Sequence, residues 1–280
     1  MIKKISYQAI PIAATIITFL LLVVGIRGVI ALLNFLPLHG KIISILAWPD
    51  VLVGLTIYIK TSIDFALFIG TLMSRYTGMR NRLAIELGTS LGNGIGTALV
   101  LCIWTFFKEI PLLLIAMIFL AAIVLLRMAE ESLVEFLSRY TPPLFIKKCI
   151  VLLVFILEKI SFATKPITRF ILPSSPLASA TIKTFAGLVF FSFTIPFILG
   201  LDDFAGYIPL FSIVNVFGFA TGAFLGHMLL NAALFAAPSV TVKIVRHPIV
   251  IVLGSVAFIV IAGIGVVEAA HIASHYFLPR

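Results

Sequence analysis

The chain has 280 residues, of which 61% are hydrophobic and 11% charged, against about 25% charged residues in a typical soluble domain. One aqueous core cannot hide so much apolar surface, so the composition excludes an ordinary soluble protein and makes a lipid bilayer the expected partner. The net charge of +9 does not predict nucleic-acid binding, because Lys and Arg gather in the cytoplasmic loops of membrane proteins.

Seven stretches of the chain are long and apolar enough to cross a bilayer as helices. The first follows Lys3 and Lys4 and exceeds the apolar core of a signal peptide, so we expect an uncleaved helix. The stretches comprise residues 10–36, 51–73, 83–107, 111–128, 187–213, 217–237 and 248–272. Residues 129–186 are instead rich in charge and proline around a short apolar run at 149–157, which predicts a connecting segment partly on the membrane surface.

The stretch around residue 64 has a counterpart later in the chain. Residues 63–69, IDFALFI, match residues 202–208, DDFAGYI, and residues 88–93, GTSLGN, match residues 222–227, GAFLGH. Two motifs in the same order predict a duplicated three-helix unit. Almost all Lys and Arg residues fall on one side of the membrane only if residues 149–157 do not cross it, and the two units then have opposite topology.

We therefore expect an all-α polytopic membrane protein made of two inverted three-helix repeats and an extra N-terminal helix. The expected parts are an N-terminal helix with its linker (1–50), a first repeat (51–128), a connecting segment (129–186) and a second repeat (187–280). Inverted repeats are a recurrent design of secondary transporters, whose substrate site lies at the repeat interface near the middle of the bilayer.

Two carboxylates are predicted at membrane depth. Asp64 lies near the middle of its apolar stretch, and Asp203 occupies the matching place in the second repeat. A carboxylate at this depth costs about 3 kcal/mol or more, and such residues usually serve a function. The pair would hold a divalent cation in place of its hydration shell. The alternative is that each is neutralised structurally, Asp64 by Lys60 one helical turn earlier.

The backbone around Asp203 is rich in residues that disturb helices. Pro196, Gly200, Gly206 and Pro209 fall within one apolar stretch. Each proline removes an amide donor and frees a carbonyl, which favours a broken helix that lines a cavity. A simple packing kink is the equally open alternative.

The second helix of each unit contributes further candidate ligands. Asn93 and His227 are aligned by the repeat, and each follows a GxxxG spacing that lets helices approach closely. Their oxygen and nitrogen atoms would complete a cation site, and the alternative is an interhelical hydrogen bond. Glu86 shares a helix face with Asn93 and is a further candidate ligand or proton carrier.

Other motifs are weaker. Glu268, His271 and His275 share one helix face near the C-terminus, as either a metal entry site or an interfacial polar end. The glycine-rich run at 92–96 does not follow a strand, which excludes a dinucleotide site. Cys102 and Cys149 lack CxxC spacing and are expected to be free. No catalytic triad, P-loop or zinc motif is present, so we expect neither an enzyme nor a bound cofactor.

Residues 61–64, TSID, and residues 200–211, GLDDFAGYIPLF, resemble the two Asp motifs of cadmium-resistance transporters. These proteins belong to the LysE superfamily of exporters, together with manganese exporters and TerC-like proteins. The resemblance covers roughly 51–128 and 187–272 and implies two inverted three-helix repeats. It also implies a multi-pass protein of the bacterial inner membrane that exports a divalent metal or another small cation, bound by Asp64, Asp203 and Asp202.

The chain departs from the family pattern beside each Asp motif. Phe65 stands where the family tends to have a second acidic residue, and Phe204 where it tends to have Asn, so cadmium itself is not implied. Two alternatives stay open. One is a LysE-type exporter of amino acids or small organic solutes, for which Lys60 argues. The other is a non-transporting membrane protein, and a homo-oligomer is compatible with either.

Overall fold

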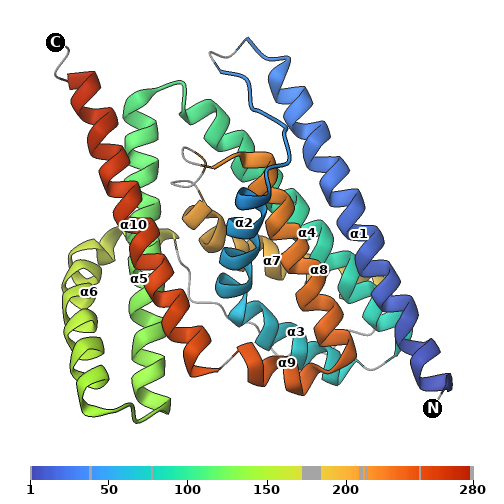
Figure 1. Ribbon diagram of the computed structural model, residues 1–280. Coiled ribbons are helices and arrows are strands. Elements are labelled where there is room, and N and C mark those ends of the chain that lie inside the picture. The colour runs from blue at the N-terminus through green and yellow to red at the C-terminus, as the bar shows by residue number, and fades with distance from the viewer. Residues whose placement is uncertain are drawn as a thin grey trace. The chain divides into compact units, whose positions relative to one another are not determined.

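The computed structural model describes residues 2–37, 40–76, 78–171, 184–207, 211, 214–245 and 247–277. The backbone alone is described at positions 2–9, 11, 63, 64, 67, 68, 71, 74, 163–171, 195, 198–207, 238, 239, 242 and 245. All regular structure in these residues is helical (Figure 1). The helices are α1 (Ile2–Asn34), α2 (Trp48–Thr61), α3 (Ile63–Arg75), α4 (Met79–Phe107), α5 (Pro111–Arg139), α6 (Leu144–Ile171), α7 (Phe185–Tyr207), α8 (Val216–Ala236), α9 (Pro238–Val245) and α10 (Pro248–Phe277).

Five stretches in the described part of the chain are long and apolar enough to cross a membrane. They are Ile12–Asn34, Met79–Phe107, Pro111–Arg139, Val216–Ala236 and Pro248–Phe277. They confirm five of the seven predicted spans, because uninterrupted apolar length is what the sequence records most directly. The chain is therefore a multi-pass membrane protein whose apolar helix faces contact lipid.

The predicted span 51–73 is interrupted. Helix α2 ends at Thr61 and α3 begins at Ile63, with Ser62 between them at φ −82° and ψ 21°. The Ser62 amide keeps its helical hydrogen bond to the Tyr58 carbonyl oxygen, which also accepts the Thr61 hydroxyl, so the interruption is a local distortion at Ser62. Asp64 consequently lies in the first turn of α3, and its side chain is outside the described residues.

The predicted span 187–213 is one helix as far as it is described. The backbone of α7 is continuous through Pro196 to Tyr207, so of the two alternatives for this stretch the broken helix is wrong within these residues. The Pro196 ring packs on Gly92 of α4, where a Cβ would lie 2.6 Å from its Cγ atom. This supports the alternative of a packing position. Asp202 and Asp203 lie near the end of α7, and their side chains are outside the described residues, as is Pro209.

The predicted connecting segment is largely helical. Helix α5 continues past residue 128 to Arg139, since ion pairs one turn apart, Arg127 with Glu131 and Arg139 with Glu135, support the exposed side of the extension. Buried Leu133 and Phe136 support its other side. Helix α6 then packs against α5. It is not among the candidate spans found in the described residues.

The chain divides into two compact units. The first comprises residues 1–103, 178–204 and 214–245, and the second comprises residues 104–177, 205–213 and 246–280. In the first unit α8 packs along α2 and also contacts α1. In the second unit α5 packs between α6 and α10. The candidate site described next lies entirely within the first unit.

Candidate functional site

A polar stripe runs along α4 inside its candidate membrane span. Each member lies three or four residues from another member, which places them on one helix face, and each is less than 5% exposed. They are Glu86, Thr89, Ser90, Asn93 and Thr97. A stripe of this kind cannot face lipid, because unpaired polar groups are costly in hydrocarbon. It faces other helices of the first unit instead.

Glu86 is the first residue of this stripe and accepts hydrogen bonds from side chains on three helices. Its Oε1 atom is 2.8 Å from the hydroxyl of Thr18 on α1 and 2.9 Å from the hydroxyl of Ser90 on α4. Its Oε2 atom is 2.8 Å from the amide nitrogen of Asn231 on α8. The Glu86 side chain is 0% exposed. All three donors are uncharged, so no described cation compensates the carboxylate.

His227 on α8 is held between Tyr58 and the Glu86 network. Its Nδ1 atom is 2.7 Å from the Tyr58 hydroxyl, and its Nε2 atom is 3.1 Å from the Asn231 amide nitrogen. The Ser90 hydroxyl lies 3.3 Å from Nε2. An amide nitrogen only donates, so Nε2 acts as the acceptor and Nδ1 bears the proton that faces Tyr58. The imidazole in this arrangement is neutral.

Close helix packing creates the network on the α2–α8 side. A Cβ at Gly222 would collide with the Val51 carbonyl oxygen, and a Cβ at Gly226 would lie 2.8 Å from Cδ1 of Tyr58. Only glycine permits this approach. It brings the Tyr58 hydroxyl to the residue after Gly226, which is His227. The predicted role of this GxxxG spacing as a close-packing face is confirmed.

A second pair of glycines acts in the same way between α4 and α7. A Cβ at Gly88 would collide with the Val189 carbonyl oxygen and lie 2.7 Å from Cβ of Ser192. A Cβ at Gly92 would collide with the Phe193 carbonyl oxygen. The polar stripe of α4 therefore lies beside a close contact between two helix backbones, as His227 and Asn231 do on α8.

The structure brings together some of the predicted site residues. Glu86 and His227 share one hydrogen-bonded network through Ser90 and Asn231. Asn93 is buried on the Glu86 face of α4, and its Nδ2 atom has no hydrogen-bond partner within the described residues. The positions of the Asp64, Asp202 and Asp203 side chains are not described, so their role stays a prediction.

The described side chains contain no group of three or more His, Cys, Asp and Glu residues able to hold a metal ion. The C-terminal metal site predicted from Glu268, His271 and His275 is therefore not formed. The rings of His271 and His275 contact each other edge to face, with centroids 4.6 Å apart, and both residues are exposed. The alternative of an interfacial polar helix end is favoured. Cys102 and Cys149 are free, as predicted.

Three members of the network were not predicted. Asn231 lies one turn after His227 on α8, so helical spacing alone was a signal that it would extend the same polar face. Thr18 and Tyr58 lie on other helices, and the sequence holds no comparable signal for them. Their contacts depend on which helix faces pack together, which the sequence of a single helix does not record.

Comparisons with protein-family models, curated proteins and solved structures found no match. The fold and the site define a class: a multi-pass membrane protein with a buried polar centre. The centre contains Glu86 and His227, and it is built by α1, α2, α4 and α8.

Proposed function

We propose that the chain is a secondary transporter of a small cation, and that Glu86 is a group at which positive charge is exchanged during transport. The observation that carries this proposal is the Glu86 carboxylate, fully buried in a candidate membrane span with only uncharged donors around it. A carboxylate in that place is stabilised when a proton or a metal cation joins it. Ionisable residues retained at such depth are characteristic of ion pathways.

His227 extends the proposed exchange site. The Ser90 hydroxyl lies within 2.9 Å of the Glu86 carboxylate and 3.3 Å of the His227 ring, two titratable groups of the network. A hydroxyl both donates and accepts, so it passes a proton between two such groups by rotating. Coupling of cation movement to a proton gradient would use this connection, and Glu86 is then the carboxylate whose protonation opposes cation binding.

The packing of the first unit supports the proposed two-repeat design. Helix α2 meets α8 through Gly222 and Gly226, and α4 meets α7 through Gly88 and Gly92. These are the two glycine pairs that the internal sequence repeat aligns. In each case the second helix of one proposed repeat packs on the first helix of the other. This reciprocal contact is expected of two inverted repeats that enclose a shared site and rock against each other.

The proposed substrate is a divalent metal, exported across a bacterial inner membrane. Asp64 and Asp203, with Asp202, are the proposed metal ligands, as the resemblance to LysE-superfamily exporters implies. Support comes from Phe65, the residue after Asp64. The ring centroid of Phe65 lies 5.7 Å from that of His227. The first turn of α3 thus adjoins the polar centre, where Glu86, Asn93 and His227 would assist the acidic ligands.

An exporter of amino acids or other small organic solutes is the second candidate. Lys60 on α2 is only 6% exposed, and a buried ammonium group is suited to a substrate carboxylate. Binding assays with the purified protein against panels of metal ions and of amino acids separate the two candidates. A non-transporting scaffold has less support, because simple packing does not require the buried Glu86 network.

The direct test is efflux from cells that express the chain. We expect the wild-type protein to raise tolerance to at least one divalent metal and to lower its cellular content. Asp64→Ala and Asp203→Ala each abolish this efflux if the acidic pair binds the metal. Efflux like that of the wild type in both variants contradicts the metal assignment, and amino-acid efflux without metal efflux supports the second candidate.

A further inference from the structure

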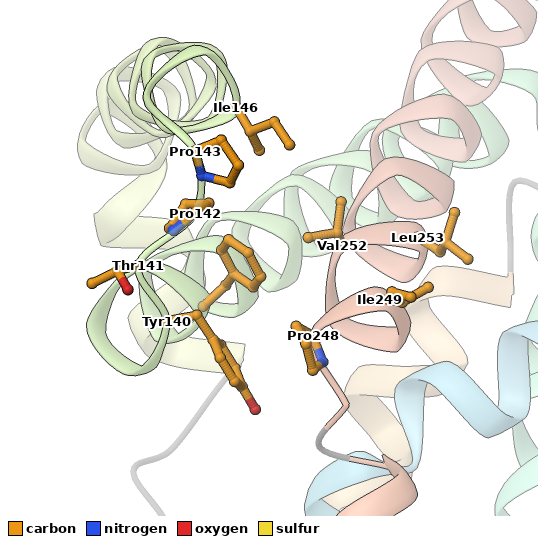
Figure 2. Close-up of a pocket in the computed structure, with 10 residues that line it drawn as sticks. Tyr140, Thr141, Pro142, Pro143, Ile146, Pro248, Ile249, Val252 and Leu253 are labelled. Carbon is orange, nitrogen blue, oxygen red and sulfur yellow. The ribbon is translucent and has the colours of Figure 1, made fainter.

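A cavity of about 520 Å³ lies in the second unit, where α5 ends and α10 begins (Figure 2). Its size falls within the range of small-molecule sites, roughly 300–1,000 Å³. The lining is almost entirely apolar. It consists of Phe136, Tyr140, Thr141, Pro142, Pro143, Ile146, Pro248, Ile249, Val252 and Leu253. Figure 2 shows Pro143 and Ile146 on one side and Val252 and Pro248 on the other.

The backbone around this cavity is stiff. Pro142 and Pro143 form the turn between α5 and α6, and Pro248 begins α10. Proline fixes φ near −65°, so the walls keep their shape without an occupant. The cavity is also short along α10, because the α10 wall runs only from Pro248 to Leu253, a rise of about 7.5 Å. Such a site suits the first part of a flexible chain that continues into the bilayer.

The charges near the cavity indicate the kind of molecule whose flexible chain would fit there. Arg139 is paired with Glu135 at 2.8 Å, so these two charges compensate each other. Lys147 and Lys148 remain at the start of α6, and both are exposed. The Lys147 amide donates to the Pro143 carbonyl oxygen, which places Lys147 one turn above a lining residue on the same helix face. The α6 side of the cavity is therefore cationic.

We propose that this cavity holds an acyl chain of an anionic glycerophospholipid, whose phosphate group contacts Lys147. The cavity adjoins the ends of two candidate membrane spans, where lipid headgroups lie. The positive-inside rule assigns the basic residues of this end to the cytoplasmic leaflet, which is rich in anionic lipids. A zwitterionic lipid fills the cavity equally well but gains little from Lys147. This proposal is independent of the transport proposal.

The test uses the full-length protein in an uncharged detergent, with lipid binding counted by native mass spectrometry. We expect phosphatidylglycerol, with a net headgroup charge of −1, to bind about fivefold tighter than zwitterionic phosphatidylcholine with the same acyl chains, as expected for one lysine beside an anionic lipid. Lys147→Gln removes this preference without weakening phosphatidylcholine. Lys159→Gln, about three turns further along α6, is the matched control and keeps the preference. Val252→Trp fills the cavity and abolishes binding of both lipids.

Equal binding of the two lipids by the wild-type protein overturns the proposal, and so does an unchanged preference in Lys147→Gln. Inorganic phosphate provides a further arm. Two results together would overturn the proposal: displacement of phosphatidylglycerol by millimolar phosphate, and continued phosphatidylglycerol binding by Val252→Trp. They would show that the site recognises an anion and not a lipid. Should Val252→Trp fail to fold, Leu253→Trp replaces it, because Leu253 lines the same cavity and is 65% exposed.

Discussion

The side-chain amide nitrogen of Asn231 lies 2.8 Å from Oε2 of Glu86 and thereby joins α8 to α4 between two candidate membrane spans. The same nitrogen lies 3.1 Å from Nε2 of His227. One amide thus donates to both Glu86 and His227. A proton that binds either group weakens the hydrogen bond that this group accepts from the Asn231 amide. Glu86 and His227 are therefore expected to respond together to the arrival of a cation.

Asn231→Leu removes this shared donor. The Glu86 Oε2 atom and the His227 Nε2 atom each lose a hydrogen bond in a site that water does not reach, and we expect the free energy of unfolding to fall by about 1–3 kcal/mol. Unfolding in mixed micelles measures the change. A double-mutant cycle with Glu86→Leu isolates the interaction between Asn231 and Glu86. A coupling energy near zero would show that this hydrogen bond does not stabilise the protein.

Thr18→Val tests whether α1 belongs to the site. Valine has nearly the shape of threonine but cannot donate to Oε1 of Glu86, so the carboxylate keeps only the Ser90 donor at that atom. We expect cation flux to fall severalfold while the protein remains folded. Thr18→Ser restores the hydroxyl and should restore most of the flux. Equal flux in the valine and serine variants would place α1 outside the mechanism.

Gly222→Ala tests the close approach of α8 to α2. The added methyl group would collide with the Val51 carbonyl oxygen, and since backbone yields poorly we expect a destabilisation of about 1–3 kcal/mol. Gly263→Ala on α10 is the matched control, because no atom lies within 4 Å of its added methyl group. Alanine there improves helix propensity by about 1 kcal/mol. Similar stability of the two variants would disprove the close contact.

Apolar length predicted most of the helices but not where they are interrupted. Five spans, including those of α4 and α8, follow from uninterrupted apolar sequence. The interruption at Ser62 is a distortion of the backbone at one residue, which hydropathy does not record. The extension of α5 to Arg139 was missed because its charged residues suggested a loop, whereas in the fold they pair one turn apart.

The site was predictable residue by residue but not as a network. Glu86 and His227 stood out because ionisable residues are rare in apolar helices. Their connection depends on Asn231, Thr18 and Tyr58, which come from three helices, and the faces that those helices share are set by tertiary packing. The glycines at 222 and 226 were the sequence signal for that packing, although they did not identify the partner helix.

The most direct measurement of the central claim is cation flux in proteoliposomes that contain the purified protein, with and without a proton gradient. Glu86→Gln keeps the shape of the side chain and removes its charge, and we predict that flux falls about tenfold or more, which corresponds to about 1.4 kcal/mol. Glu158→Gln, exposed on α6, is the control and should transport like the wild type. Undiminished flux in folded Glu86→Gln would contradict the account.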